Sequence, residues 1–168
     1  MTMQGALAAH AAFSFPVRVY YEDTDAAGVV YYANYLKFME RARTEWLEAL
    51  GYPLAAFERA YGVAFVVRRA GIEFLLPARL NDRLDVTVEA LARGASRIEL
   101  EQKVLRETTE LAIARITLAC LDTSRWRPTR MPAPLAATLD AGAGTTLRAQ
   151  RPSRGAPEFP ESKEQETL

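Results

Sequence analysis

Early in the chain the hydrophobic pattern has two periods, first that of a strand and then that of a helix. Apolar and polar residues alternate over residues 17–22, which predicts a half-buried strand. A polar stretch that ends in glycine, residues 23–28, predicts a turn. Apolar residues then recur at helical spacing over residues 34–50, which predicts an amphipathic helix. Gly51 and Pro53 follow, where a left-handed cap and a stop are expected.

From residue 63 almost to residue 122 the pattern is that of strands. Short polar turns separate these strands, which favours an antiparallel meander. Both faces of the last strand are largely apolar, as is typical of a central strand covered on both sides. One helix cannot cover such a sheet on both faces, so it fills the concave face of a curved sheet, or a second subunit covers the rest, or both hold. The expected strands are residues 63–69, 72–76, 84–91, 98–104 and 112–120.

The two ends of the chain lack such patterning. Residues 1–14 show no sustained period and are expected to form a flexible arm, and the absence of Lys or Arg before Arg18 argues against a signal peptide. Residues 139–168 are rich in proline and mixed charge and have no apolar period, so they bury too little surface to offset their ordering entropy. We therefore expect a single folded domain at residues 15–138 and a disordered C-terminal tail.

Two small counts restrict the chemistry of this chain. Its 168 residues include one His and one Cys, so Cys120 has no partner for an intramolecular disulfide and a Cys/His zinc cluster is excluded. The histidine, His10, lies in the expected arm, which argues against Ser–His–Asp and Cys–His catalysis. No phosphate-binding glycine motif is present. We expect no cofactor and no metal site, although a carboxylate-only metal site stays open without support.

The overall charge gives no hint of a partner. Lys plus Arg and Asp plus Glu both number 21, so no net field attracts the chain to nucleic acid. No apolar run reaches the length that a transmembrane helix needs. The expectation is a soluble cytoplasmic protein with neither a nucleic-acid partner nor a transmembrane segment.

The strongest candidate for chemistry is the junction between the first strand and the helix. Glu22, Asp23 and Asp25 place carboxylates directly after the strand, and Gly28 and an apolar, aromatic run lead into the helix. Free N–H groups at a helix entrance can stabilise an oxyanion. A carboxylate held there can act as nucleophile or general base, and burial beside other carboxylates would raise its pKa. The same pattern also occurs in turns without catalytic roles, so spacing alone does not decide.

Longer motifs carry a resemblance to a known family. Residues 17–35 (VRVYYEDTDAAGVVYYANY) and 38–46 (FMERARTEW) resemble the signature of hotdog-fold acyl-CoA thioesterases. They look like the branch associated with the Tol–Pal envelope system, which is similar to 4-hydroxybenzoyl-CoA thioesterase. The resemblance covers about residues 16–132 and implies an α+β hotdog fold, in which a curved antiparallel sheet wraps around one long helix. It also implies homodimers or homotetramers with the active site at a subunit boundary. Further matches are residues 65–69, 72–74, 77–80, 82 and 93–96.

The resemblance also implies roles for single residues. The family's catalytic carboxylate is the second Asp of the D-x-D pair, Asp25, and its oxyanion donor is a backbone N–H at Tyr32. Many members of the Tol–Pal branch carry His at that position and the 4-hydroxybenzoyl branch carries Tyr, so a backbone role is unaffected while an accessory imidazole is missing. Gly28 and Val29 are expected beside the substrate. Asp23 is interpreted as an ionised neighbour or as a turn cap.

Binding of coenzyme A requires cations for its phosphates, and Arg is suited to bidentate contacts. The resemblance points to the turn with Arg93, Ser96 and Arg97. The arginines of residues 125–130 form a second candidate group. Residues 68–69, both arginine, match the family and could equally serve a subunit contact. In a chain this rich in Arg, a solvated surface side chain is the competing interpretation for each.

Together these observations predict hydrolysis of an acyl-CoA thioester to a free acid and CoA. Asp25 would attack the carbonyl or activate water, and the sequence leaves both routes and the acyl group open. The alternative is a non-catalytic hotdog module that binds an acyl group or a protein partner of the cell envelope. Retention of Asp25 beside Gly28 argues against that module, which has no need of them. A hotdog dehydratase is disfavoured, because its sites resemble a His/acid pair and His10 is badly placed.

Overall fold

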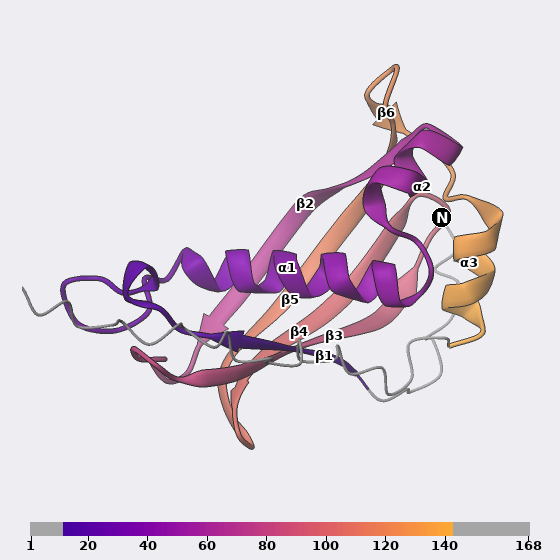
Figure 1. The fold of residues 1–168 in the computed structure, drawn as a ribbon. Coiled ribbons are helices and arrows are strands. Elements are labelled where there is room, and N and C mark those ends of the chain that lie inside the picture. Colours follow the sequence, from indigo (N-terminus) through magenta and orange to yellow (C-terminus); the bar gives the residue numbers. More distant parts are fainter. Residues whose placement is uncertain (1–11, 143–168) are drawn as a thin grey trace, which may run out of the picture.

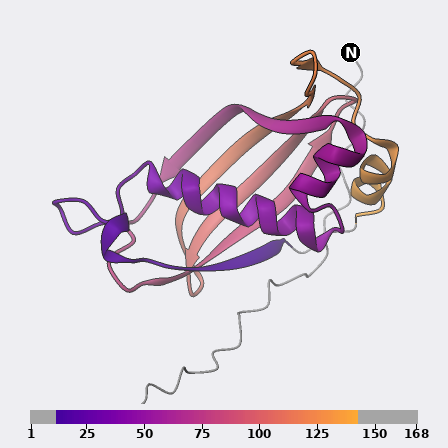
Figure 2. The ribbon, with the colours of Figure 1, turned by 45° about the horizontal axis from the view of Figure 1, so that its top comes forward.

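A curved antiparallel sheet wraps around one long helix, α1 (Asn34–Ala49), as Figure 1 shows. The computed structural model describes residues 12–142, so nearly all of the expected arm, with His10, and most of the expected tail lie outside the described residues. The helix predicted at residues 34–50 is confirmed. The helix lies along the concave side of the sheet (Figure 2), and its apolar stripe belongs to the buried core. The first of the two expected ways of covering the sheet therefore holds in this chain.

The sheet has six strands, in the order β1-β3-β4-β5-β2, with the short β6 paired to β5. All neighbours are antiparallel. The expected meander holds for β3 to β5, whereas β1 and β2 form the two edges and β2 pairs with β5 instead of β3. The central strand predicted at residues 112–120 is confirmed as the interior strand β5. The strands are β1 (Phe13–Arg18), β2 (Val63–Phe74), β3 (Arg83–Arg93), β4 (Arg97–Arg106), β5 (Thr109–Asp122) and β6 (Arg127–Pro128).

The first strand starts and ends earlier than its pattern predicted. β1 pairs with β3 from Phe13 to Arg18, and a 3₁₀ turn, η1 (Tyr21–Asp23), takes the end of the predicted strand. Alternating burial nevertheless continues to Val19, which is fully buried and bonded through its N–H to the Asp82 carbonyl at 2.9 Å. The periodicity therefore marked Val17 and Val19 correctly as buried, but Tyr21 on the same expected face is 82% exposed and the predicted strand boundaries were wrong.

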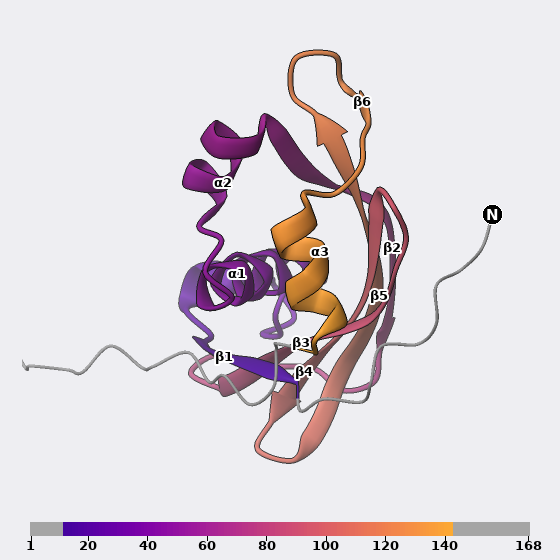
Figure 3. The same cartoon turned by 90° about the vertical axis from the view of Figure 1, so that its right-hand side faces the viewer.

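Two short helices were not expected from the sequence. α2 (Leu54–Tyr61) follows α1 and ends at Gly62, whose φ is 63°. α3 (Ala133–Asp140) lies at the same end of the molecule and covers the opening of the curved sheet (Figure 3). It buries Leu135 and Leu139, so the folded unit continues past the expected boundary at residue 138.

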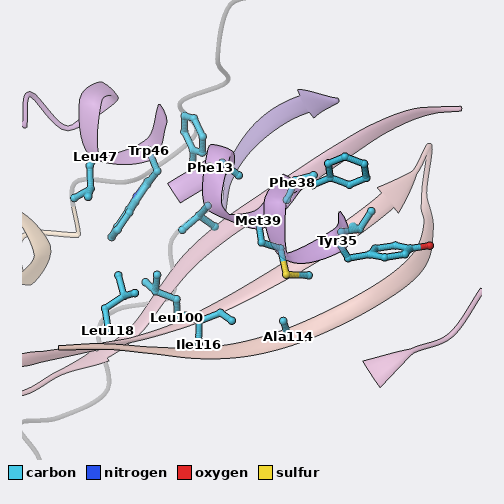
Figure 4. Packing of buried hydrophobic residues seen from close by; sticks show 14 of the residues in the cluster. Phe13, Tyr35, Phe38, Met39, Trp46, Leu47, Leu100, Ala114, Ile116 and Leu118 are labelled. Atoms are coloured by element: carbon cyan, nitrogen blue, oxygen red, sulfur yellow. The ribbon is translucent and has the colours of Figure 1, made fainter. Parts of the chain in front are cut away.

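The core lies between α1 and the concave face of the sheet (Figure 4). Phe38, Met39 and Trp46 on α1 are buried with the inward side chains of β4 and β5, such as Leu100 and Ile116. Burial of each large apolar side chain stabilises the fold by about 1.5–3 kcal/mol. This packing fixes the position of α1, and with it the position of the loop that leads into α1.

Candidate active site

The loop between η1 and α1 is a tight turn held by backbone hydrogen bonds. The Asp25 N–H donates to the Val29 carbonyl and the Gly28 N–H donates to the Asp25 carbonyl, both at 2.9 Å. Gly28 has a φ of 75°, in the left-handed region that glycine adopts without steric cost. The Val30 N–H bonds to the Ala78 carbonyl at 2.8 Å, which ties the turn to the segment before β3. The Asp-Ala-Ala-Gly sequence therefore folds into a hydrogen-bonded turn that holds the Asp25 backbone in place.

Asp25 presents its carboxylate to solvent at this turn. One oxygen, Oδ1, accepts the Ala27 N–H at 2.8 Å, which orients the group. Asp25 and Gly28 line an open hollow of about 580 Å³ together with Tyr21 and Leu80. Such a volume lies in the range of small-molecule sites. The expected burial of Asp25 is not found in a single chain, where its side chain is exposed.

Asp23 has a different role from that of Asp25. It is 8% exposed, and its Oδ2 accepts the Tyr20 N–H at 2.8 Å. Its backbone carbonyl accepts hydrogen bonds from the Tyr31 N–H and from Asn34 Nδ2, both at 2.9 Å. Its interpretation as a turn cap is confirmed, and the two carboxylates of the D-x-D pair are separated into one structural and one exposed group.

The entrance to α1 has no side-chain cap and no acidic residue in its first turn. Among the described residues, none accepts a hydrogen bond from the backbone N–H of Tyr32. The pKa of Tyr31 is raised, chiefly because its side chain hydrogen-bonds to that of Tyr32, and the charge of Asp25 adds to the shift. The positive end of the helix dipole remains available for an anion.

Two residues that sequence reasoning missed fix the start of α1, one to this loop and one to the segment before β3. Asn34 uses its amide to bond to the Asp23 carbonyl, as described above, and is 7% exposed. The hydroxyl of Tyr35 accepts the Ala78 N–H at 2.9 Å, and burial raises the pKa of this tyrosine. In the sequence, the one sign of these roles was that Asn34 and Tyr35 carry polar groups at the start of a helix expected to be partly buried.

The turn proposed for CoA phosphates lies away from Asp25 within one chain. The Asp25 turn is tied to the segment before β3, near Arg83, whereas the proposed phosphate turn follows Arg93 at the other end of that strand. The two ends of β3 are about 30 Å apart. The guanidinium of Arg93 forms a two-pronged ion pair with Asp140 on α3, with Nε to Oδ1 at 2.6 Å. The Ser96 carbonyl accepts the Cys120 N–H at 2.8 Å, and Arg97 points to the outer face of the sheet. One chain therefore does not bring Arg93, Ser96 and Arg97 to Asp25.

The second arginine group is remote from the turn as well. Arg125 and Arg127 lie on the β5–β6 hairpin, which projects from the opposite end of the molecule (Figures 1 and 3). Trp126 at its tip has a φ of 51° and is 66% exposed. Within residues 12–142, no group of three His, Cys, Asp or Glu side chains is placed to hold a metal ion, and no helix is long and apolar enough to cross a membrane.

Comparison with known proteins gives one consistent family. The sequence profile of the Thioesterase-like superfamily matches residues 19–139. The acyl-CoA thioesterase YbgC of Haemophilus influenzae is 44% identical over 120 residues, which cover 71% of this chain and 88% of that protein. The 1,4-dihydroxy-2-naphthoyl-CoA hydrolase of Thermosynechococcus vestitus is 37% identical over 122 residues, covering 72% and 84%.

Solved structures agree with the sequence comparison. The crystal structure of a probable thioesterase from Bartonella henselae superimposes with a TM-score of 0.69 at 33% identity, covering 73% of this chain and all of that one. The hotdog fold implied by the sequence motifs is thereby confirmed. The profile match, these relatives and the shared fold show that the chain belongs to the thioesterase-like superfamily.

Proposed function

We propose that this protein hydrolyses an acyl-CoA thioester to a free carboxylic acid and CoA. The relatives named above as acyl-CoA thioesterase and acyl-CoA hydrolase support this reaction class. The observation that carries the proposal is the pairing of an exposed, oriented carboxylate with an uncapped helix entrance. Asp25 supplies the carboxylate. The N–H of Tyr32, which has no acceptor among residues 12–142, lies at the helix entrance.

In the proposed reaction the thioester carbonyl lies between Asp25 and the Tyr32 N–H. Asp25 either attacks the carbonyl carbon and forms an anhydride that water then opens, or takes a proton from the attacking water. In both routes the C–S bond breaks and CoA leaves as the thiol after proton transfer. The Tyr32 amide and the helix dipole stabilise the oxyanion, and loss of one such donor typically lowers the rate about a hundredfold or more. The reaction asks for no cofactor.

The neighbouring residues fit supporting roles in this reaction. Gly28 lets the chain reverse and leaves space for the substrate, since nothing lies within 4 Å of the point where a Cβ would be. Val29 is half-buried and forms an apolar wall next to Asp25. For the CoA phosphates we propose contacts from Ser96 and Arg97, with Arg93 fixing the shape of their turn through its ion pair with Asp140.

A second copy of the chain is part of the proposal. β2 is an edge strand whose outer side has no partner among the described residues, and Val67 and Phe74 on it are 48% and 45% exposed. Leu75 and Leu76 continue this apolar row at 42% and 47% exposure. Antiparallel pairing of β2 with its copy would cover the row and place the Val63 end of the partner next to the Phe74 end. The resulting homodimer, or a homotetramer built from it, would bring the Ser96 turn of one chain closer to Asp25 of the other.

Substitution of Asp25 tests this proposal. Asp25→Asn should fold normally and lose nearly all CoA release from a panel of aliphatic and aromatic acyl-CoA substrates, because the amide is neither nucleophile nor base. Glu22→Gln removes an exposed carboxylate three residues away and should leave turnover unchanged. Wild-type turnover in Asp25→Asn would refute the assigned role. Release of CoA from no substrate by the wild-type protein would favour the non-catalytic binding module.

A further inference from the structure

A second hollow lies on the convex face of the sheet, opposite to α1. Its volume is about 310 Å³, and β2, β5 and β4 all contribute to its lining. Thr117 lies at its centre on β5, flanked across the ladder by Arg69 on β2 and Glu99 on β4. The sequence neighbours of Thr117 on β5 point into the core, so this row faces outward. The lining residues are Arg68, Arg69, Arg97, Glu99 and Thr117.

A β-bulge brings two consecutive arginines to this hollow. Val67 pairs with Leu118 and Arg69 pairs with Thr117, so Arg68 is an extra residue between two regular pairs. In a regular strand, neighbouring side chains point to opposite faces of the sheet. The bulge breaks this alternation and directs both guanidinium groups to the same side. Bulges often re-aim side chains in this way next to functional sites.

The two arginines are not neutralised within the described part of the chain. The side chains of Arg68 and Arg69 make no ion pair or hydrogen bond with a described residue. Other cations of the same face are paired, since Arg115 binds Glu101 at 2.8 Å. Two like charges held side by side repel each other, so an anion that contacts both arginines would relieve this repulsion.

We propose that this hollow binds a phosphate or diphosphate group. Arg68 and Arg69 would donate planar N–H pairs to its oxygens, and the Thr117 hydroxyl would add a further donor. Arginine is suited to such bidentate contacts with phosphate. Pairing of β2 with a second copy would leave the site open, because ladder bonds run in the plane of the sheet while these side chains project from it. The group could belong to the nucleotide end of CoA, a source that rests on the proposed function, or to a free anion.

Calorimetric titration with inorganic diphosphate tests the site directly. The double variant Arg68→Ala/Arg69→Ala should bind diphosphate roughly tenfold or more weakly than wild type, because it loses charge-assisted hydrogen bonds. Arg115→Ala removes a cation of the same face and should keep wild-type affinity. The double variant should also unfold at no lower temperature without ligand. Equal affinity in wild type and double variant, or no binding by wild type, would overturn the proposal.

Kinetics then identify the source of the phosphate. If CoA supplies it, the double variant should show a raised KM for acyl-CoA, an unchanged kcat, and unchanged kinetics with an acyl-N-acetylcysteamine thioester, which lacks the nucleotide. If a free anion supplies it, diphosphate affinity should fall while both KM values stay the same. Equal loss with both thioesters would contradict a phosphate site. A wild-type protein that hydrolyses neither thioester would refute the proposed function, whereas the diphosphate titration would still decide the site.

Discussion

At the scale of single residues, the turn around Asp25 depends on backbone groups as much as on side chains. Asp25 and Gly28 could be selected from the sequence because a carboxylate and a glycine in a turn are visible there. Asn34 and Tyr35 could not, because their role is to satisfy a carbonyl and an N–H that become buried only in the folded chain. A sequence shows which side chains are polar, but it does not show which backbone groups become buried away from water and need a side chain as hydrogen-bond partner.

Gly28→Ala is expected to damage this turn through the backbone alone. The added methyl meets no atom within 4 Å, but the φ of 75° is unfavourable for a residue with a Cβ. We expect the free energy of unfolding to fall by about 1–2 kcal/mol and kcat to fall with it, because Asp25 shifts. Urea unfolding and turnover would measure both. Gly71 is a strand glycine without a positive φ and with equally free surroundings, so Gly71→Ala should change neither the free energy of unfolding nor kcat. An equal loss in both variants would contradict the argument.

At the scale of elements, α1 and the strands β3, β4 and β5 were predictable because each has a buried face of regular period. β2 has no such face, and the two strands expected at residues 63–69 and 72–76 form one, Val63–Phe74. α2 was not predictable, since Phe57 is its one buried residue and a single position has no period. The strand order was also out of reach. It depends on how α1 and α2 carry the chain across the concave face, so that β2 joins the sheet at the edge opposite to β1. Periodicity identifies elements but not their neighbours.

The Arg93–Asp140 ion pair that fastens α3 to β3 should make this element sensitive to acid. The hydrogen bond from Arg93 lowers the pKa of Asp140, so the pair stabilises the fold above the unfolded aspartate value of about 3.9 and loses its effect as pH falls through the lower folded value. Asp140→Asn should therefore be less stable than wild type at neutral pH. The difference in free energy of unfolding, measured by urea titration across pH, should shrink in acid. A constant difference would contradict an ionic origin.

At the scale of the whole molecule, one chain does not bring the proposed substrate contacts together. Asp25 is exposed, the candidate CoA contacts lie at the far end of β3, and the edge of β2 carries an apolar row. The sequence suggested a second subunit because the predicted sheet had more apolar surface than one helix could cover. It did not show which edge stays open, because that follows from strand order.

Val67→Asp should disrupt the proposed dimer. A carboxylate on the open strand would have to lose water when two β2 edges pair, whereas in a separate chain it stays hydrated. We expect light scattering to give a dimer mass for wild type and a monomer mass for the variant, with loss of turnover. Leu54→Asp on α2 changes a residue of similar exposure, 41% against 48%, and should remain dimeric. A monomeric wild type, or a dimeric Val67→Asp, would contradict pairing through β2.

The order of the strands also determines when each element can fold during synthesis of the chain. α1 leaves the ribosome early with its apolar stripe, but the core that buries this stripe also needs side chains of β3, β4 and β5, and β5 ends at Asp122. β2 must likewise wait for β5, since Phe74 pairs with Ala112 and Val63 with Asp122. Until β5 emerges, this nascent chain exposes an uncovered helix face and an unpaired strand, both of which favour aggregation. Folding therefore depends on contacts between distant segments, which makes this sheet slower to form than a helical bundle of the same length.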